Sequence, residues 1–186
     1  GPGGVKMAIR GGVDCIEHGY YLDDEAIAMM VENDVYYVPT INVTQYKAFM
    51  DAARAAEHHV EKATRAAKAH LEGFQKALKA GVKMASGADF SPVAEMGLVE
   101  IEQLVRAGMT ELQALIAATR TAADLCGVAD QLGTVERGKL ADLIAVDGNP
   151  LEDLSNIRKL RMVLKEGNVV DTQPTEGLSG FWGLYY

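Results

Sequence analysis

The feature that most constrains the fold of this chain is an alternation of short strand-like runs with amphipathic helices. Strand patterns occupy residues 13–17, 35–41 and 82–86, and a helical pattern precedes and follows each of them. Neighbouring strands that are joined by helices run parallel, because a parallel pair needs a long crossover connection. The sequence therefore predicts an α/β fold built on a parallel sheet or barrel.

Capping residues and apolar spacing predict where the helices lie. Asp23 or Asp24 and Thr110 are typical N-cap residues, and glycines follow the apolar pattern at several helix ends. The expected helices cover residues 5–11, 24–33, 45–79 (as one helix or as two with a bend), 95–107 and 110–125. In the second of them we expect an inner face made of Ala26, Ile27, Met30 and Val31.

After Gly127 the pattern changes to short strands and tight turns, expected at residues 133–138, 141–147, 161–165 and 169–170. We therefore predict three regions, with an α/β part at residues 1–130, a small β unit at 131–172 and an aromatic tail at 173–186. Four aromatic side chains crowd the last six residues, 181–186. The tail either covers a subunit interface or a barrel opening, or docks on the core of its own chain.

Charge and cysteine usage exclude several classes of partner. The net charge of −8 and the pI near 5.0 favour neither nucleic acid nor an anionic membrane surface, which are bound by clustered lysine and arginine. No apolar run approaches the roughly 18 residues of a membrane span. Cys15 and Cys126 form no paired motif and are expected to be buried free thiols, which suits the reducing cytoplasm.

Two polar residues, His18 and Asp89, directly follow strand-like runs. Because side chains alternate along a strand, we expect His18 to share a barrel-facing side with Asp14 and Ile16, with Glu17 turned toward the helices. By the same alternation Asp89 shares a side with Ala85 and Gly87. If both sides line a barrel, the imidazole and the carboxylate converge at its C-terminal mouth, where they can bind a metal and move a proton.

Other polar residues are weaker candidates. His58 and His59 are adjacent in a charged helix and point in different directions, so a solvated face is expected for them. His70 lacks a supporting carboxylate or cysteine pattern. Thr40 either contacts a substrate at the barrel mouth or simply closes its strand, and Asp142 is expected to be a turn or surface group.

Several short motifs occur in the chain, namely the runs at residues 16–19 with 22–25, 87–89, 117–123, and 133–144 with 148–150. Together they resemble the amidohydrolase superfamily, in particular its imidazolonepropionase-like and prolidase-like branch. The resemblance implies a (β/α)8 TIM barrel with one or two divalent metals and a small β-sandwich domain assembled from both termini. On this basis residues 13–18, 35–41 and 82–89 match barrel strands six, seven and eight, and residues 133–171 match the C-terminal part of the sandwich.

The resemblance also implies roles for the two candidate residues. His18 takes the metal-ligand position of strand six, and Asp89 takes the strand-eight position that binds metal and shuttles a proton. The implied reaction is hydrolysis of a C–N bond in a small-molecule cyclic amide or dipeptide, with a divalent metal, expected to be zinc, in the complete protein.

The sequence departs from the family pattern, because it has no HxH pair, no lysine placed to bridge two metals and no strand-five histidine. We therefore expect a C-terminal fragment that is inactive alone, holds incomplete metal ligands or no metal, and needs a missing N-terminal segment or copies of itself. The alternatives are a non-catalytic fragment or oligomerising interaction module without metal, and a small-molecule-binding barrel half without metal.

Overall fold

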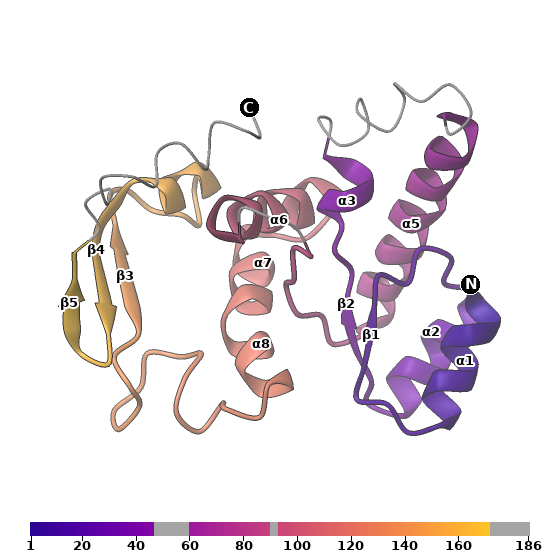
Figure 1. Ribbon diagram of the computed structural model, residues 1–186, viewed down its shortest axis with the longest axis horizontal. Helices are drawn as coiled ribbons and strands as arrows, with labels where there is room; N and C mark the ends of the chain where they lie inside the picture. The colour runs from indigo at the N-terminus through magenta and orange to yellow at the C-terminus, as the bar shows by residue number, and fades with distance from the viewer. Residues whose placement is uncertain (47–59, 90–92, 172–186) are drawn as a thin grey trace. The chain divides into compact units, whose positions relative to one another are not determined.

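The computed structural model of the protein describes residues 1–46, 60–89 and 93–171 (Figure 1). The chain divides into two compact units, Gly1–Thr134 and the part from Val135 onwards. The first unit has parallel strands with helices between them, and the second has a small antiparallel sheet. The predicted mixed α/β character is therefore confirmed.

Helices and short parallel strands alternate in the first unit. The elements are α1 (Pro2–Arg10), β1 (Cys15–Glu17), α2 (Asp24–Glu32), β2 (Tyr36–Val38), α3 (Asn42–Gln45), α5 (Val60–Ala80), α6 (Val93–Ala107), α7 (Glu111–Ala118) and α8 (Arg120–Leu125). Strands β1 and β2 pair in parallel with Ile16 opposite Tyr37. The predicted strand at 82–86 is reduced to a parallel bridge between Met84 and Tyr37, which is flanked by hydrogen bonds from Tyr37 N–H to Lys83 O and from Ala85 N–H to Tyr37 O.

The first two helices agree with the predictions except at the start of α1 and at Val31 of α2. Asp23 is the N-cap of α2, since its Oδ1 accepts a hydrogen bond of 2.8 Å from Ala26 N–H. Helix α1 begins at Pro2 instead of residue 5, because proline suits a first helical turn that needs no N–H donor. Val31 was expected inside, but it is 47% exposed.

The single helix predicted for residues 110–125 is wrong, because the helix is interrupted at Thr119, which lies between α7 and α8. The Thr119 hydroxyl donates to Leu115 O at 2.6 Å, a bond of the kind that distorts helices, and ψ at Thr119 is −84°. The predicted start of a helix at residue 45 is wrong, because Gln45 ends the short helix α3 and Tyr46 has an extended backbone with ψ of 121°. Residues 47–59 of this predicted helix lie outside the described residues, and its remaining part lies in α5.

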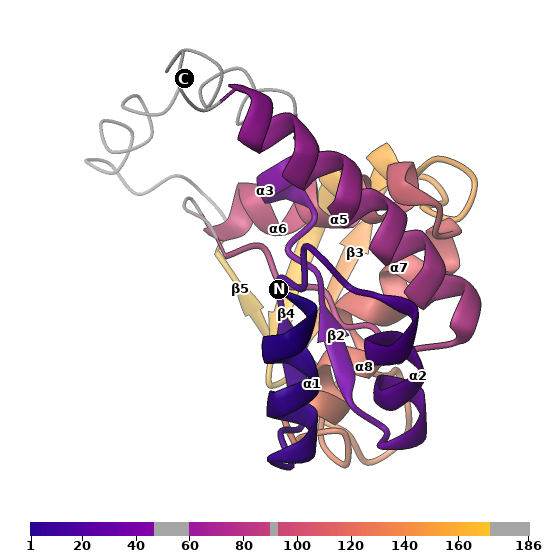
Figure 2. The ribbon, with the colours of Figure 1, turned by 90° about the vertical axis from the view of Figure 1, so that its right-hand side faces the viewer.

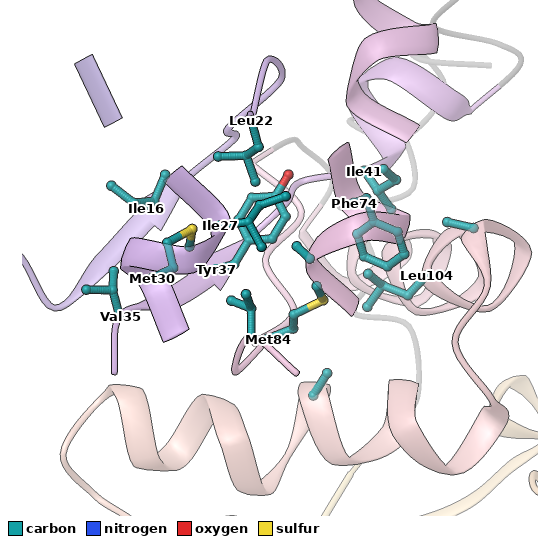
Figure 3. Packing of buried hydrophobic residues seen from close by; sticks show 14 of the residues in the cluster. Ile16, Leu22, Ile27, Met30, Val35, Tyr37, Ile41, Phe74, Met84 and Leu104 are labelled. Carbon is teal, nitrogen blue, oxygen red and sulfur yellow. The ribbon is translucent and has the colours of Figure 1, made fainter. Parts of the chain in front are cut away.

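The core of the first unit lies between the strands and the surrounding helices. Phe74 of α5 packs with Ile41 and Leu104, and Tyr37 of β2 packs with Ile27 and Met84 (Figure 3). Helix α5 contacts both α2 and α3, and Figure 2 shows it as the long helix that passes beside them. This packing fixes β2, and with it the segment that follows the strand.

The second unit contains β3 (Leu143–Val146), a short 3₁₀ helix at Leu154–Arg158, β4 (Leu160–Lys165) and β5 (Asn168–Val170), with the strands paired antiparallel in the order β3-β4-β5. A strand predicted at 133–138 is wrong, because this segment is a series of turns in which Gly133 and Gly138 have φ of 87° and 97°. Asp142 has the expected turn role, since its Oδ1 accepts a 2.7 Å hydrogen bond from Glu166 N–H.

The two described cysteines are free, as expected, but their burial differs from the prediction. Cys15 is half-buried and Cys126 is exposed. Among the helices that the structure describes, none has the length and apolarity that a bilayer crossing requires.

A capping box at the start of α7 gives a first prediction. Thr110 Oγ1 accepts a hydrogen bond from Gln113 N–H at 3.2 Å, and Gln113 Oε1 accepts one from Thr110 N–H at 2.8 Å. Thr110→Ala removes the first bond, so we expect the free energy of unfolding in urea to fall by about 1 kcal/mol. Thr110→Ser keeps the hydroxyl and should lose only a few tenths of this, and equal losses in both variants would contradict the capping role.

Candidate metal centre

The structure brings His18 and Asp89 together, although they are far apart in the sequence. The distance between His18 Nε2 and Asp89 Oδ2 is 3.8 Å, and the two side chains are 45% and 64% exposed. This distance is too long for a hydrogen bond. Zinc bonds to nitrogen and oxygen of about 2.0–2.2 Å place two ligands of one ion roughly 3–4 Å apart. The pair therefore fits two ligands of a single divalent metal.

A tight turn at the end of β1 directs the His18 side chain. Gly19 N–H donates to Glu17 O at 2.8 Å, and His18 between them has φ of +65°, which makes the rare positive-φ form of a γ-turn. The turn is held from both sides, because His18 N–H donates to Val38 O at 2.9 Å and the Tyr37 hydroxyl donates to His18 O at 3.0 Å.

Because of this turn, the prediction that His18 shares a side of the strand with Ile16 is wrong. Ile16 was expected on the barrel side with His18, but it is buried in the cluster that includes Ile27 and Met30 of α2 (Figure 3). Glu17, expected to face the helices, is exposed. The partner of Glu17 is Cys15, whose Sγ lies 3.2 Å from Glu17 Oε1. The alternation ends at Glu17, and the γ-turn reorients His18.

A residue with a positive φ follows each of the three parallel segments, which are β1, β2 and the bridged segment at Met84. His18, Thr40 and Asp89 have φ of 65°, 48° and 49°. A positive φ is uncommon for residues other than glycine, and it is a true outlier for a β-branched residue such as threonine. Such strain of about 1–3 kcal/mol per residue persists where the surroundings enforce it, often at functional sites. All three residues are held at the same end of the parallel segments.

Thr40 contacts the His18 ring directly. Its Oγ1 lies 2.9 Å from His18 Nδ1 and donates to Pro39 O at 2.7 Å, while the residue is only 1% exposed. The sequence suggested a substrate contact or a strand end for Thr40. The tertiary structure adds a role that sequence reasoning missed, namely contact with the candidate ligand.

Tyr20 lies between His18 and a second histidine, His70. The Tyr20 ring centroid is 5.7 Å from that of His18 and 4.7 Å from that of His70. His70 is fully buried, and its Nδ1 lies 2.6 Å from Thr44 Oγ1. Burial, and then the charge of His18, lowers the pKa of His70 to about 4, so the buried ring is neutral at pH 7. His58 and His59 lie outside the described residues.

A buried carboxyl group anchors the segment after β2. Glu100 Oε1 accepts Ile41 N–H at 2.9 Å, and Glu100 Oε2 accepts Asn42 N–H at 2.8 Å. Burial raises the pKa of Glu100 to about 7, although these two N–H bonds act in the opposite direction. Sequence reasoning missed Glu100. The signal was its helical spacing from apolar Met96 and Leu104, which puts it on the inner face of α6.

The pair does not by itself complete a metal centre. Within residues 1–46, 60–89 and 93–171, no three His, Cys, Asp or Glu side chains gather in a way that could hold an ion. Burial and the hydrogen bond to Glu17 raise the pKa of the Cys15 thiol to about 11, so it does not supply a thiolate at neutral pH. The pair of His18 and Asp89 would therefore need further ligands to hold a metal ion.

Several known proteins are similar to this chain. Ochratoxinase of Aspergillus niger is 34% identical over 164 residues, covering 88% of this chain and 34% of that protein. A crystal structure of a Xaa-Pro dipeptidase with bound methionine in the active site has a TM-score of 0.83 and 39% identity over 91% of this chain and 43% of that one. A putative prolidase from Bifidobacterium longum has a TM-score of 0.82 and 28% identity, covering all of this chain and 49% of its own.

This chain thus spans about a third of the length of the ochratoxinase and less than half of each of the two compared structures. The sequence profile of the amidohydrolase family matches residues 1–170, which is nearly the whole chain. The motif resemblance and the mixed α/β character are confirmed, and the chain belongs to the amidohydrolase family.

Proposed function

We propose that the protein is part of a metal-dependent amidohydrolase in which His18 and Asp89 bind a divalent metal, with zinc as the expected ion. The observation that carries the proposal is the 3.8 Å separation of His18 Nε2 and Asp89 Oδ2. Imidazole and carboxylate form a ligand set that zinc accepts. When bound, such a metal lowers the pKa of a water molecule to about 7 and so makes a nucleophile at neutral pH.

Asp89 is the residue that moves the proton in this proposal. Its side chain is 64% exposed, so a water molecule and a substrate can both reach the carboxylate. An ionised carboxylate accepts a proton from the attacking water and can pass it to the leaving amine. His18 has the simpler role of holding the metal, because Thr40 fixes its ring from the other side.

The substrate in this proposal has a C–N bond in a cyclic amide or a dipeptide. Similarity to a Xaa-Pro dipeptidase and to a putative prolidase favours a dipeptide. Since hydrolytic zinc sites use at least three protein ligands, the remaining ligands come from a part of the protein other than the described residues, or from a second copy. Free Cys15 and Cys126 support a cytoplasmic setting.

Metal analysis tests the proposal. The chain is purified alone and together with the N-terminal part of its proposed parent, and bound metal is measured by mass spectrometry and zinc titration. In the longer protein we expect stoichiometric metal. His18→Ala and Asp89→Asn should each weaken metal binding strongly. The loss should exceed the roughly 10- to 100-fold that follows when a residue that hydrogen-bonds a metal ligand is removed.

A matched control is Asp24→Asn, which removes an exposed carboxylate whose partner is Lys76 at 2.7 Å. This variant should bind metal like the wild type. If the longer protein holds no metal and keeps its hydrolytic activity in the His18 and Asp89 variants, the metal-dependent reading is wrong. A longer protein with neither metal nor activity would favour the non-catalytic, interacting alternative.

A further inference from the structure

The hydroxyl group of Thr40 hydrogen-bonds the Tyr20 side chain and has two further partners, His18 and Pro39. The last two make different demands on its single hydrogen, whereas a tyrosine hydroxyl can either donate or accept. Pro39 O lies 2.7 Å from Thr40 Oγ1, and His18 Nδ1 lies 2.9 Å from the same oxygen. A carbonyl oxygen only accepts hydrogen bonds, whereas a neutral imidazole nitrogen either donates or accepts. Both contacts are therefore hydrogen bonds at the same time only if Thr40 donates to Pro39 and His18 Nδ1–H donates to Thr40.

We propose that Thr40 is a positioning residue, whose hydroxyl holds His18 in the Nδ1–H tautomer and thereby leaves the Nε2 lone pair facing Asp89. The tautomer of a metal-binding histidine is set by the hydrogen bond of its other ring nitrogen. The opposite tautomer would carry a hydrogen on Nε2, the atom that lies 3.8 Å from Asp89 Oδ2, and this hydrogen would block a metal.

Thr40 is itself held in place from a different helix. Glu100 of α6 accepts the N–H groups of Ile41 and Asn42, the two residues that follow Thr40, at 2.9 and 2.8 Å. This carboxyl group fixes the chain directly after the β-branched residue whose φ is 48°. Because Thr40 is 1% exposed, water does not compete freely for its hydroxyl group. The oxygen that accepts from His18 is thus fixed in position before any metal arrives.

This inference deepens the metal site of the proposed function and rests on it, but it concerns a property of the protein without metal. Its test is therefore independent of metal content. A wrong tautomer would overturn the role of Thr40 and leave the ligand assignment to metal analysis. Absence of metal from the longer protein would overturn the ligand assignment and leave the tautomer measurement intact.

The experiment is a long-range ¹H–¹⁵N correlation spectrum of the full chain with ¹⁵N-labelled histidine, recorded without metal near pH 8.5, where histidine side chains are neutral. The chain has four histidines, and the His18 signals are identified by their loss in His18→Gln. We expect His18 to be mainly the Nδ1–H tautomer in the wild type and in Thr40→Ser. In Thr40→Val, which has the same shape without the hydroxyl group, this form should become the minority.

Thr44→Val is the matched control, because Thr44 Oγ1 contacts the other described histidine, His70, at 2.6 Å. It should shift the His70 signals and leave those of His18 unchanged. A wild-type His18 with Nε2 protonated overturns the proposal, and so does a Thr40→Val spectrum that keeps the Nδ1–H form. If Thr40→Val does not fold, the wild-type spectrum decides alone.

Discussion

Replacing Gly19 by alanine should destabilise the first unit by about 2–5 kcal/mol, as measured by urea unfolding. Two effects add. Gly19 has φ of +54°, where an L-residue costs about 1–2 kcal/mol. The new Cβ would also lie 2.8 Å from Tyr37 Cε2. Overpacking of this kind costs about 1–3 kcal/mol.

The Tyr37 ring has little freedom to move away from a methyl group at position 19. Tyr37 is fully buried, and its hydroxyl group donates to the carbonyl of His18, the residue next to Gly19. A shift of the ring would therefore pull on the γ-turn that directs the His18 imidazole. We expect Gly19→Ala to weaken the proposed metal site as well as the fold.

Gly12→Ala separates the two effects. Gly12 also has a positive φ, of +82°, but a Cβ there would meet nothing within 4 Å. This variant should lose only the backbone contribution of about 1–2 kcal/mol. Equal losses at Gly12 and Gly19 would show that the contact with Tyr37 contributes nothing.

The second large effect concerns the pH dependence of the free energy of unfolding, to which Glu100 and His70 should contribute with opposite signs. Glu100 has its pKa raised to about 7 from an ordinary 4.5, because burial disfavours its charged form. The unfolded chain therefore ionises first, and the stability due to this group is lost as the pH rises from about 4.5 to 7. A difference of this size corresponds to about 3 kcal/mol.

His70 acts with the opposite sign over nearly the same range. Its pKa is lowered to about 4 from 6.5, again chiefly by burial. The unfolded chain binds the proton first, so the stability due to His70 is lost as the pH falls from about 6.5 to 4. This contribution is also about 3 kcal/mol. Together the two groups should largely cancel in the wild type.

Single substitutions should reveal each dependence. In Glu100→Gln only the His70 dependence remains, so the free energy of unfolding should increase as the pH is raised from 4 to 6.5, more steeply than in the wild type. In His70→Gln only the Glu100 dependence remains, so the free energy of unfolding should decrease as the pH is raised from 4.5 to 7. Each substitution also adds a constant loss, so only the slope is diagnostic. Urea unfolding at several pH values measures it. Parallel profiles for all three proteins would show that neither group titrates abnormally in the fold.

Local sequence patterns predicted helices and strands best where a capping side chain or a regular alternation of elements was present. Asp23 and Thr110 cap the helices that their side chains indicated, and the alternation of strands and helices identified the parallel α/β unit. The failures have local causes that periodicity does not encode. Thr119 bends the helix through its own hydroxyl group, and the glycine-rich segment at 133–138 forms turns where strands were expected.

The sequence by itself determined the family, the alternation of strands and helices in the first unit and the two residues that follow the strands, because motifs, spacing and caps are properties of neighbouring residues. Only the tertiary structure decided how His18 meets Asp89. The γ-turn depends on Tyr37, the ring is held by Thr40 across 22 positions, and the segment after Thr40 is anchored by Glu100 across 58 or 59. These contacts form between distant parts of the chain only when the core packs.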